Sequence, residues 1–269
     1  MNGWAEMAKR GVNTLPPPLR LAAFVTARGV ARKVVPRYQH SAKIFAAIGG
    51  SDLKIHSGPF RGVRYISAAT GSTMLPKLLG TYELELHDAV EKFCAAQPDV
   101  IVDVGSAEGY YAVGFAFRLP DAKVICYDID PYARYLLHRL SARNGVSDRV
   151  MQKEACDPRE LEKVLSPARR PVVIMDVDGP EDQLLRPDQT LSLARTWIIV
   201  ELHDFLNAGV SQRIRERFES SHEIILVNSL DRTVADLPPG VELSAGDALD
   251  AMGEARPAAQ QWFVMTPKN

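Results

Sequence analysis

The sequence predicts an α/β protein with a doubly wound, mostly parallel sheet. Four apolar runs, each ending in acidic residues, recur along the chain, and helical segments separate them. The runs lie at 99–105, 123–130, 171–179 and 196–204. Short apolar strands that alternate with helices are typical of βαβ units, whose sheet is covered by helices on both faces. Right-handed crossovers bring the carboxyl ends of these strands to one edge, where open α/β sheets bind ligands.

The first 50 residues are predicted to form a basic helical extension. They carry eight Lys/Arg and a single acidic residue. A helix is expected over 21–48, after the proline-rich break at 14–20 and before Gly49-Gly50. We interpret it as a peripheral helix whose basic side is solvated. Peripheral contact with an anionic membrane or a partner is the alternative.

Residues 51–96 are predicted to form a cap on the main domain. The segment 53–67 alternates in polarity and contains Gly-Pro, which predicts a hairpin or two short strands. A helix is expected within 74–96, beginning near Thr81. Tyr82, Glu83 and His87 are candidate contacts that close over a ligand, and the solvated face of a helix is the alternative for them.

The remaining elements complete one domain over 51–269. A chain of 269 residues, 46% of them apolar, suffices for one sizeable core with a small appendage. Further helices are expected at 110–119, 132–145, 158–166, 181–194 and 211–222. A third strand lies within 148–156, and the tail at 262–269 is predicted to pair antiparallel with 223–228. The expected fold is therefore Rossmann-like, with an antiparallel C-terminal strand.

The segment VDVGSAEGYYAVG, residues 102–114, places two glycines four residues apart between the first strand and its helix. Glycine permits a tight turn and close approach of the backbone to a ligand. The spacing is neither the GxGxxG of dinucleotide enzymes nor a P-loop. Asp103 and Glu108 stand where a pyrophosphate would require a helix N-terminus without carboxylates. The turn therefore favours a cationic or zwitterionic ligand.

Asp128 ends the second strand, about 20 residues after Gly109, and an acid at that place can accept both hydroxyls of a ribose. The predicted ligand thus has a ribose and a positive centre, and it lacks phosphate. S-adenosylmethionine (SAM) has these features.

At three places the chain resembles class I SAM-dependent methyltransferases, and more narrowly the FkbM-like group. The matching segments are Asp103-Val104-Gly105, Tyr127-Asp128-Ile129-Asp130-Pro131 and Asp176-Val177-Asp178-Gly179-Pro180-Glu181. The segment IVELHD at 199–204 is similar to the fifth-strand segment of that group. The resemblance covers roughly 80–230. It departs at Ala107, where many members have Gly or Asn, and at Asp178, where Glu is commoner.

The resemblance and the strand pattern together imply a set of cofactor-binding residues. They are Asp103, Gly105, Ser106, Ala107, Glu108, Gly109, Tyr110, Asp128, Ile129, Ala155, Cys156 and Asp176. Asp103 is expected near the ammonium of SAM and Asp128 at the ribose. The backbone of Ala155 and Cys156, after the third strand, is expected near the adenine.

Methyl transfer is a displacement at the methyl carbon, and a hydroxyl acceptor needs a base. The candidate catalytic residues are Asp176 after the fourth strand and Glu201 and His203 after the fifth. His203 has an ordinary pKa near neutrality, although a merely structural bond to Asp204 or to backbone is the alternative. His222 is expected to be structural.

A divalent metal such as Mg²⁺ is considered but not favoured. Hard oxygen ligands suit Mg²⁺, but the spacing of the carboxylates is only permissive, and we predict no metal site. The residues that could supply ligands are Asp176, Asp178, Glu181, Glu201 and His203.

We therefore predict an enzyme, a SAM-dependent methyltransferase acting on a hydroxyl of a small molecule or saccharide. A non-catalytic SAM-binding or interaction protein, held to a partner or membrane by its basic N-terminus, is the alternative. The net charge of −1 argues neither for nor against a nucleic-acid partner. The only basic concentration is N-terminal and no Asn-Pro-Pro-Tyr motif follows the fourth strand, so we predict no nucleic-acid partner. Three cysteines, Cys94, Cys126 and Cys156, are interpreted as reduced thiols of a cytoplasmic protein. The oligomeric state is left open.

Overall fold

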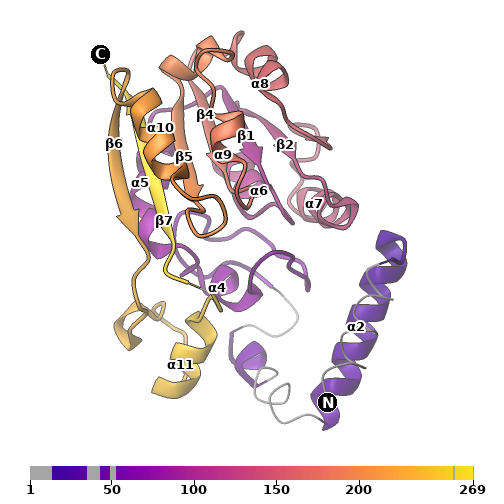
Figure 1. Cartoon of the computed structure of the whole chain (residues 1–269). Coiled ribbons are helices and arrows are strands. Elements are labelled where there is room, and N and C mark those ends of the chain that lie inside the picture. Colours follow the sequence, from indigo (N-terminus) through magenta and orange to yellow (C-terminus); the bar gives the residue numbers. More distant parts are fainter. Residues whose placement is uncertain (1–13, 35–42, 49–52, 257, 269) are drawn as a thin grey trace.

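The computed structural model describes residues 14–34, 43–48, 53–256 and 258–268. Within these segments seven strands form one sheet in the order β3-β2-β1-β4-β5-β7-β6 (Figure 1). The strands are β1 (Val100–Val104), β2 (Lys123–Tyr127), β3 (Val150–Lys153), β4 (Pro171–Met175), β5 (Trp197–Leu202), β6 (His222–Asn228) and β7 (Gln261–Pro267). Strands β1 to β5 pair in parallel, whereas β7 is antiparallel to β5 and β6. The predicted α/β sheet with an antiparallel C-terminal strand is confirmed.

Helices cover both faces of this sheet, as in a doubly wound fold. Helices α5 (His87–Ala95), α6 (Tyr110–Arg118) and α7 (Pro131–Arg143) contribute to the core on one face. Helices α8 (Pro158–Leu165) and α10 (Val210–Phe218) contribute to the core on the other. The strand order reverses between β1 and β4, which makes the carboxyl ends of these two strands the expected ligand crevice.

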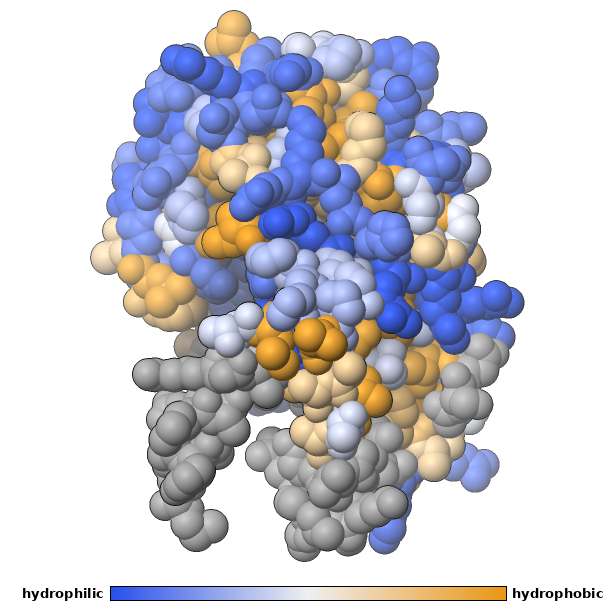
Figure 2. All heavy atoms as spheres, turned by 90° about the vertical axis from the view of Figure 1, so that its right-hand side faces the viewer, coloured by the Kyte–Doolittle hydropathy of each residue, from blue (hydrophilic) through white to orange (hydrophobic). Residues whose placement is uncertain are grey.

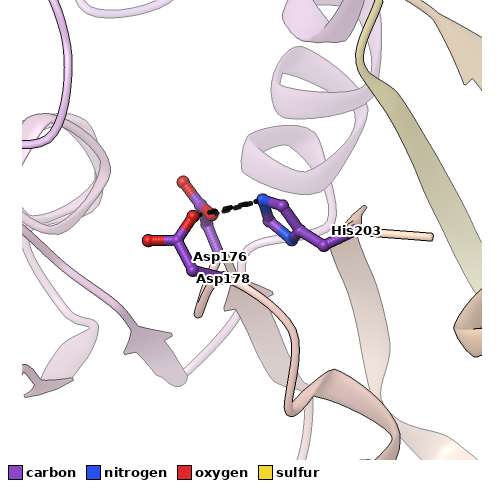
Figure 3. Close-up of side chains that lie close together, drawn as sticks. All are labelled: Asp176, Asp178 and His203. Atoms are coloured by element: carbon purple, nitrogen blue, oxygen red, sulfur yellow. Dashed lines mark ion pairs between the residues drawn. The ribbon is translucent and has the colours of Figure 1, made fainter. Parts of the chain in front are cut away.

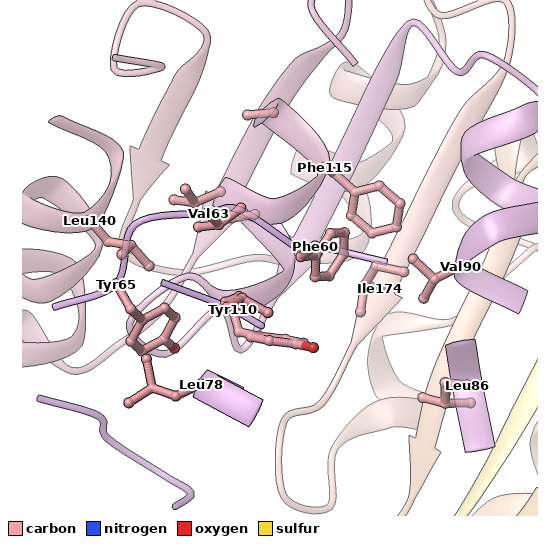
Figure 4. Close-up of a cluster of buried hydrophobic side chains, with 14 of the residues drawn as sticks. Phe60, Val63, Tyr65, Leu78, Leu86, Val90, Tyr110, Phe115, Leu140 and Ile174 are labelled. Atoms are coloured by element: carbon pink, nitrogen blue, oxygen red, sulfur yellow. The ribbon is translucent and has the colours of Figure 1, made fainter. Parts of the chain in front are cut away.

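The cap packs on α6 through a cluster of aromatic rings (Figure 4). Phe60 of the cap meets the rings of Tyr110 and Phe115 edge to face, with centroids 5.2 and 5.4 Å apart. A Cβ on Gly114 of α6 would lie 2.4 Å from the Phe60 ring, so glycine is required there. This packing fixes the cap over the amino end of α6, beside the carboxyl end of β1.

The structure refines two predicted features of the cap. In the segment 53–67 the expected hairpin is present in a short form: Lys54 and Arg64 make one antiparallel bridge, and the N–H groups of Ile55 and Tyr65 donate to the carbonyl oxygens of Val63 and Leu53. The helix expected to begin near Thr81 begins later, with the 3₁₀ turn η1 (Leu84–Leu86) followed by α5, and a separate helix α4 (Met74–Leu79) precedes it. Gly80 ends α4 in the left-handed region, at φ 77°, and a Cβ there would lie 2.0 Å from the carbonyl oxygen of Ser57. Close packing of two backbones thus ends α4.

Differences also occur after β4 and before β7. The helix expected at 181–194 is only α9 (Glu181–Leu184), followed by the 3₁₀ turn η2 (Leu191–Arg195). Pro187 disfavours helical backbone at the residue before it, which explains the break. Another 3₁₀ turn, η3 (Val234–Asp236), and helix α11 (Ala245–Met252) were not predicted.

The N-terminal extension contains α2 (Pro17–Val34), and residues 43–47 are helical again. The stretch 35–42 and the expected end at Gly49-Gly50 lie outside the described residues. Helix α2 docks on α7, where Arg20 lies 4.2 Å from the Tyr132 ring and 3.6 Å from the Asp130 carboxylate. The side of the molecule where α2 lies has a largely hydrophilic upper part and a cluster of apolar side chains lower down (Figure 2).

In the described part of the chain, no helix combines the length and the apolar character needed to cross a bilayer. The three cysteines are free thiols: Cys94 and Cys126 are buried and Cys156 is partly exposed. His222 has the structural role that was expected, because it is buried and its Nε2 lies 2.9 Å from the Thr196 carbonyl oxygen.

Candidate active site

A cavity of about 790 Å³ opens at the carboxyl edge of the sheet. Its wall is formed by the residues that follow β1, β2, β3, β4 and β5, together with the cap and the segment between α11 and β7. This volume lies within the range of small-molecule and cofactor sites. The acidic strand ends that the sequence placed on one edge therefore do converge on one cavity.

The loop between β1 and α6 is shaped by its two glycines. Gly105 has φ 83°, and a Cβ there would lie 1.6 Å from the carbonyl oxygen of Asp176. Gly109 has φ 96°, and a Cβ there would meet Leu137 at 2.2 Å. Both positions exclude side chains by packing as well as by backbone conformation.

Asp128 holds this loop against the end of β2. Its Oδ2 accepts the backbone N–H of Ala107 at 2.8 Å, and its Oδ1 accepts the N–H of Asp130 at 2.8 Å. The side chain is half-buried and lines the cavity. Each carboxylate oxygen retains a lone pair after these bonds, so Asp128 can both shape the loop and accept two ligand hydroxyls.

Several buried polar atoms of the cavity wall have no partner within the described chain. They are Asp103 Oδ2, Ser106 Oγ, Tyr127 Oη and Gln260 Oε1. Buried polar atoms are rarely left unpaired, and these four face a site large enough for a ligand. Burial raises the pKa of Asp103 to about 8, with the carboxylates of Asp128 and Asp176 adding to the rise. A cationic ligand group would return Asp103 to its ionised form.

Most of the predicted cofactor-binding residues line the cavity. They are Asp103, Gly105, Ser106, Ala107, Tyr110, Asp128, Ile129, Ala155, Cys156 and Asp176. Gly109 is absent from the described lining and acts through the shape of the loop.

Glu108 corrects the sequence-based expectation of a cofactor contact. Its fully buried carboxylate turns toward the cap, where it accepts the Tyr65 hydroxyl at 2.6 Å and the Thr70 N–H at 3.0 Å. Lys77 Nζ lies 2.5 Å from the same carboxylate. These contacts occupy both oxygens of Glu108, so the residue fastens the cap to the loop.

The three predicted catalytic residues meet at the ends of β4 and β5. His203 Nε2 lies 3.7 Å from Asp176, 3.5 Å from Asp178 and 3.7 Å from Glu201. Figure 3 shows the imidazole of His203 pointing at the two aspartates from the neighbouring strand end. Nδ1 of His203 lies 2.5 Å from the buried Glu181, which the sequence analysis considered only as a metal ligand. Asp204, the expected structural partner of His203, instead binds Ser211.

The acidic surroundings shift the pKa of each group. Burial alone would lower the pKa of His203, but the hydrogen bond to Glu181 and the nearby carboxylates outweigh it and raise the pKa. The pKa of Asp176 rises to about 6, mainly through burial in the cavity wall, although His203 opposes the rise. Burial and the charges of Asp176 and Glu83 raise the pKa of Glu201 to about 10. Arg256, 3.9 Å away, opposes this rise, and the net shift favours the protonated form, which can donate a hydrogen bond.

Asp176, Asp178 and His203 each offer one ligand atom, and these atoms lie within 4.8 Å of one another. The geometry would admit a divalent cation. Of the other residues considered for metal, Glu181 is engaged with Nδ1 of His203, and Glu201 lies 3.9 Å from Arg256.

The C-terminal segment contributes to the site although no sequence pattern indicated it. Arg256, Gln260 and Trp262 line the cavity, and Arg256 lies 3.6 Å from Glu83 of the cap and 4.8 Å from the centroid of the Trp262 ring. Glu254 accepts hydrogen bonds from Arg256 and fixes the guanidinium. These residues follow no recognisable motif, and only the antiparallel return of β7 beside β5 brings them to the site.

No family model matches the sequence. A 78-residue stretch is 36% identical to the release factor glutamine methyltransferase of Chlorobaculum tepidum, covering 27% of this chain and 26% of that protein. The match thus spans about a quarter of the length of that relative.

Three methyltransferases are among the solved structures whose backbones are similar to this one. The O-methyltransferase TomG from Streptomyces achromogenes in complex with SAM is 15% identical, with a TM-score of 0.46 over 90% of this chain and 96% of that one. The O-methyltransferase from Bacillus cereus in complex with SAH is 14% identical, with a TM-score of 0.44 over 90% and 97%. A precorrin-6Y C5,15-methyltransferase from Geobacter metallireducens is 11% identical, with a TM-score of 0.45 over 69% and 87%.

Proposed function

We propose that this protein is a SAM-dependent methyltransferase that transfers the methyl group to a hydroxyl of a small molecule or saccharide. One observation carries the proposal: a single cavity joins a loop held by Asp128 to an imidazole whose Nε2 lies among the carboxyl groups of Asp176, Asp178 and Glu201. The first part fits a nucleoside cofactor, and the second fits a base for the acceptor. The curated match over 78 residues, to a methyltransferase, supports this proposal.

The chemistry of the cavity wall fits SAM. Asp103 can pair with the ammonium of the cofactor and Asp128 can accept the ribose hydroxyls. Ala155 and Cys156 line the side after β3, where the adenine is expected. SAM supplies an electrophilic methyl group when bound, and the protein aligns the acceptor with it. The finer assignment to the FkbM-like group rests on the three motifs after β1, β2 and β4.

His203 is the proposed base. Its Nδ1 donates to Glu181, and its Nε2 lies at the cavity beside Asp176 and Asp178. In the neutral imidazole Nε2 carries a lone pair that can accept a proton. An acceptor hydroxyl placed there would give its proton to Nε2 as the oxygen attacks the methyl carbon. Asp176 stabilises the imidazolium that forms, and the protonated Glu201 can donate a hydrogen bond to the acceptor.

The test is methyl transfer from radiolabelled SAM to a panel of phenols, alkyl alcohols and methyl glycosides. We expect turnover with at least one acceptor and a loss of at least 100-fold in kcat for His203→Gln. His138→Gln, an exposed histidine on α7, is the matched control and should retain full activity. Retained SAM binding without transfer to any acceptor would favour the non-catalytic alternative.

The need for a metal is decided by the same assay with EDTA-treated protein. The proposed mechanism uses His203 Nε2 as a proton acceptor, which a metal ligand could not be. Activity that survives EDTA supports the proposal. Activity lost with EDTA and restored by Mg²⁺ would assign Asp176, Asp178 and His203 to a metal and remove the base role.

A further inference from the structure

The loop after β5 places two large apolar side chains in the cavity wall beside His203. Phe205 is 53% exposed and Leu206 is 56% exposed, yet both line the cavity. The ring of Phe205 lies 5.6 Å from that of His203, inclined at 59°. Leu206 packs over the turn at Gly179, where a Cβ would lie 3.6 Å from it. An apolar wall therefore adjoins the nitrogen that would accept the proton.

Polar side chains around this wall are already engaged with one another. Asn207 Nδ2 donates to the Gly179 carbonyl oxygen at 2.7 Å and to Asp182 at 3.1 Å. Arg213 donates to Asp182 at 2.6 Å and to Asn207 Oδ1 at 2.8 Å. A saccharide buries many hydroxyls, and each one left unpaired is costly. These engaged groups lie behind the wall, and Asp178 and Gln183 are the polar side chains that line the cavity beside its apolar surface.

Aromatic side chains also line the cavity beyond the catalytic cluster. Trp262 is paired in register with Glu201 across β5 and β7, and Tyr82 comes from the cap. Aromatic surfaces bind flat rings through edge-to-face and offset contacts. Trp262 is only 1% exposed and lies beneath Arg256, so Phe205 and Leu206 supply the exposed apolar wall beside the carboxyl groups and the imidazole of the reacting position.

From these observations we infer that the acceptor is an aromatic hydroxyl compound, a phenol in the broad sense, whose ring rests on Phe205 and Leu206. This inference depends on the proposed methyltransferase function. In the reaction the phenolic O–H bond breaks and its proton moves to His203 Nε2. The oxygen forms a bond to the methyl carbon, and the carbon–sulfur bond electrons go to sulfur, giving S-adenosylhomocysteine (SAH) and an aryl methyl ether.

The test compares three probes of similar size on the intact protein: 2-naphthol, decahydro-2-naphthol and methyl glucoside. Each is titrated into the SAH complex and then assayed with SAM. We expect 2-naphthol to bind and to be methylated, with kcat/KM at least tenfold above either other probe. Phe205→Ala should raise KM for 2-naphthol at least tenfold, and Phe205→Tyr should restore most of it.

Leu191→Ala is the matched control, because Leu191 is 73% exposed on η2 and does not line the cavity. It should leave KM unchanged. Preferred methylation of methyl glucoside, or binding of none of the probes by a protein that binds SAH, would overturn the phenol inference while the cofactor assignment stands. Failure to bind SAM or SAH at all would instead overturn the proposed function.

Discussion

Nδ1 of His203 lies 2.5 Å from Oε1 of Glu181, and both side chains are almost fully buried. The same oxygen accepts the backbone N–H of Gly179 at 2.9 Å, so it acts as an acceptor and Nδ1 carries the proton. The pair therefore fixes one tautomer and one ring orientation, with Nε2 toward the cavity. In this account Glu181 is a positioning residue for the base.

Glu181→Gln should keep the side-chain shape and remove the charge. The hydrogen bond to Glu181 is the main influence that raises the pKa of His203 against the effect of burial. Loss of the carboxylate charge, which strengthens this hydrogen bond, should lower the pKa of His203. The acidic limb of the kcat profile should therefore move to lower pH. We expect kcat at neutral pH to fall about 10- to 100-fold, the scale typical of such outer partners.

A pH profile of kcat for both proteins measures this effect. Glu223→Gln, on exposed β6, is the control and should leave the profile unchanged. A Glu181→Gln protein with normal kcat and an unshifted limb would show that His203 does not act as the base.

Asp103 should make cofactor affinity depend on pH. Its pKa is about 8 in the free protein, so it is mostly protonated at pH 6 and becomes ionised as the pH rises. If the ionised form pairs with the ammonium of SAM, Kd should fall about fivefold or more between pH 6 and 7.5. Titration calorimetry should also detect proton release, and Asp103→Asn should bind weakly with little pH dependence. A Kd for the unmodified protein that does not change with pH would contradict this role.

The same residue should cost stability in the absence of cofactor. The pKa of Asp103 rises from 3.8 to about 8 on folding, so the folded state holds more protons between these values. The free energy of unfolding is therefore undiminished by Asp103 below about pH 4. It falls as the pH rises from there through 8, because the unfolded chain loses this proton first. Asp103→Asn removes this loss, and we expect its Tm to exceed that of the unmodified protein by a few degrees at pH 8. Thermal unfolding at pH 5 and 8 measures it, and an advantage that does not grow with pH would contradict the buried-carboxyl account.

A comparison of Gly105→Ala with Gly145→Ala separates the stability cost of a strained backbone from the cost of a steric clash. Both glycines have positive φ, 83° and 66°, so both substitutions carry a similar strain of about 1 kcal/mol. A Cβ at Gly105 would lie 1.6 Å from the Asp176 carbonyl oxygen, whereas at Gly145 nothing lies within 4 Å. We expect Gly105→Ala to lower the free energy of unfolding by at least 2 kcal/mol more than Gly145→Ala. Denaturant unfolding of both proteins measures the difference, and equal losses would show that the loop can move away from β4.

The sheet was predictable because its signals are local. The short apolar runs of β1, β2, β4 and β5 predict buried strands. Asp130-Pro131 begins α7 as expected, and the Asp130 side chain accepts the Tyr132 N–H. The separate helix α4 was not predicted, and the turn at Gly80 that ends it depends on the backbone of Ser57, 23 residues away. A contact between distant segments determines the structure there.

The candidate site likewise combines features that follow from local sequence signals with features that depend on contacts between distant segments. Asp128 and Gly105 could be placed at the cavity from the sequence, because both follow the carboxyl ends of strands that the sequence predicts. The partner of His203 could not, because Glu181 reaches it through the packing of α9 against the end of β5. Glu108 was assigned to the ligand on its charge, but the buried Lys77, which the sequence shows only as one cation of a helix, holds it toward the cap.

The central claim is that the cavity binds SAM through Asp128, and calorimetric titration with SAM and separately with NAD⁺ tests it most directly. We expect micromolar binding of SAM, no binding of NAD⁺, and at least a tenfold weaker SAM affinity for Asp128→Ala. Asp157→Ala is the matched control, because Asp157 also accepts two backbone N–H groups, those of Arg159 and Glu160, but at the start of α8. It should bind SAM normally. Binding of NAD⁺ in place of SAM, or SAM affinity unchanged by Asp128→Ala, would contradict the account.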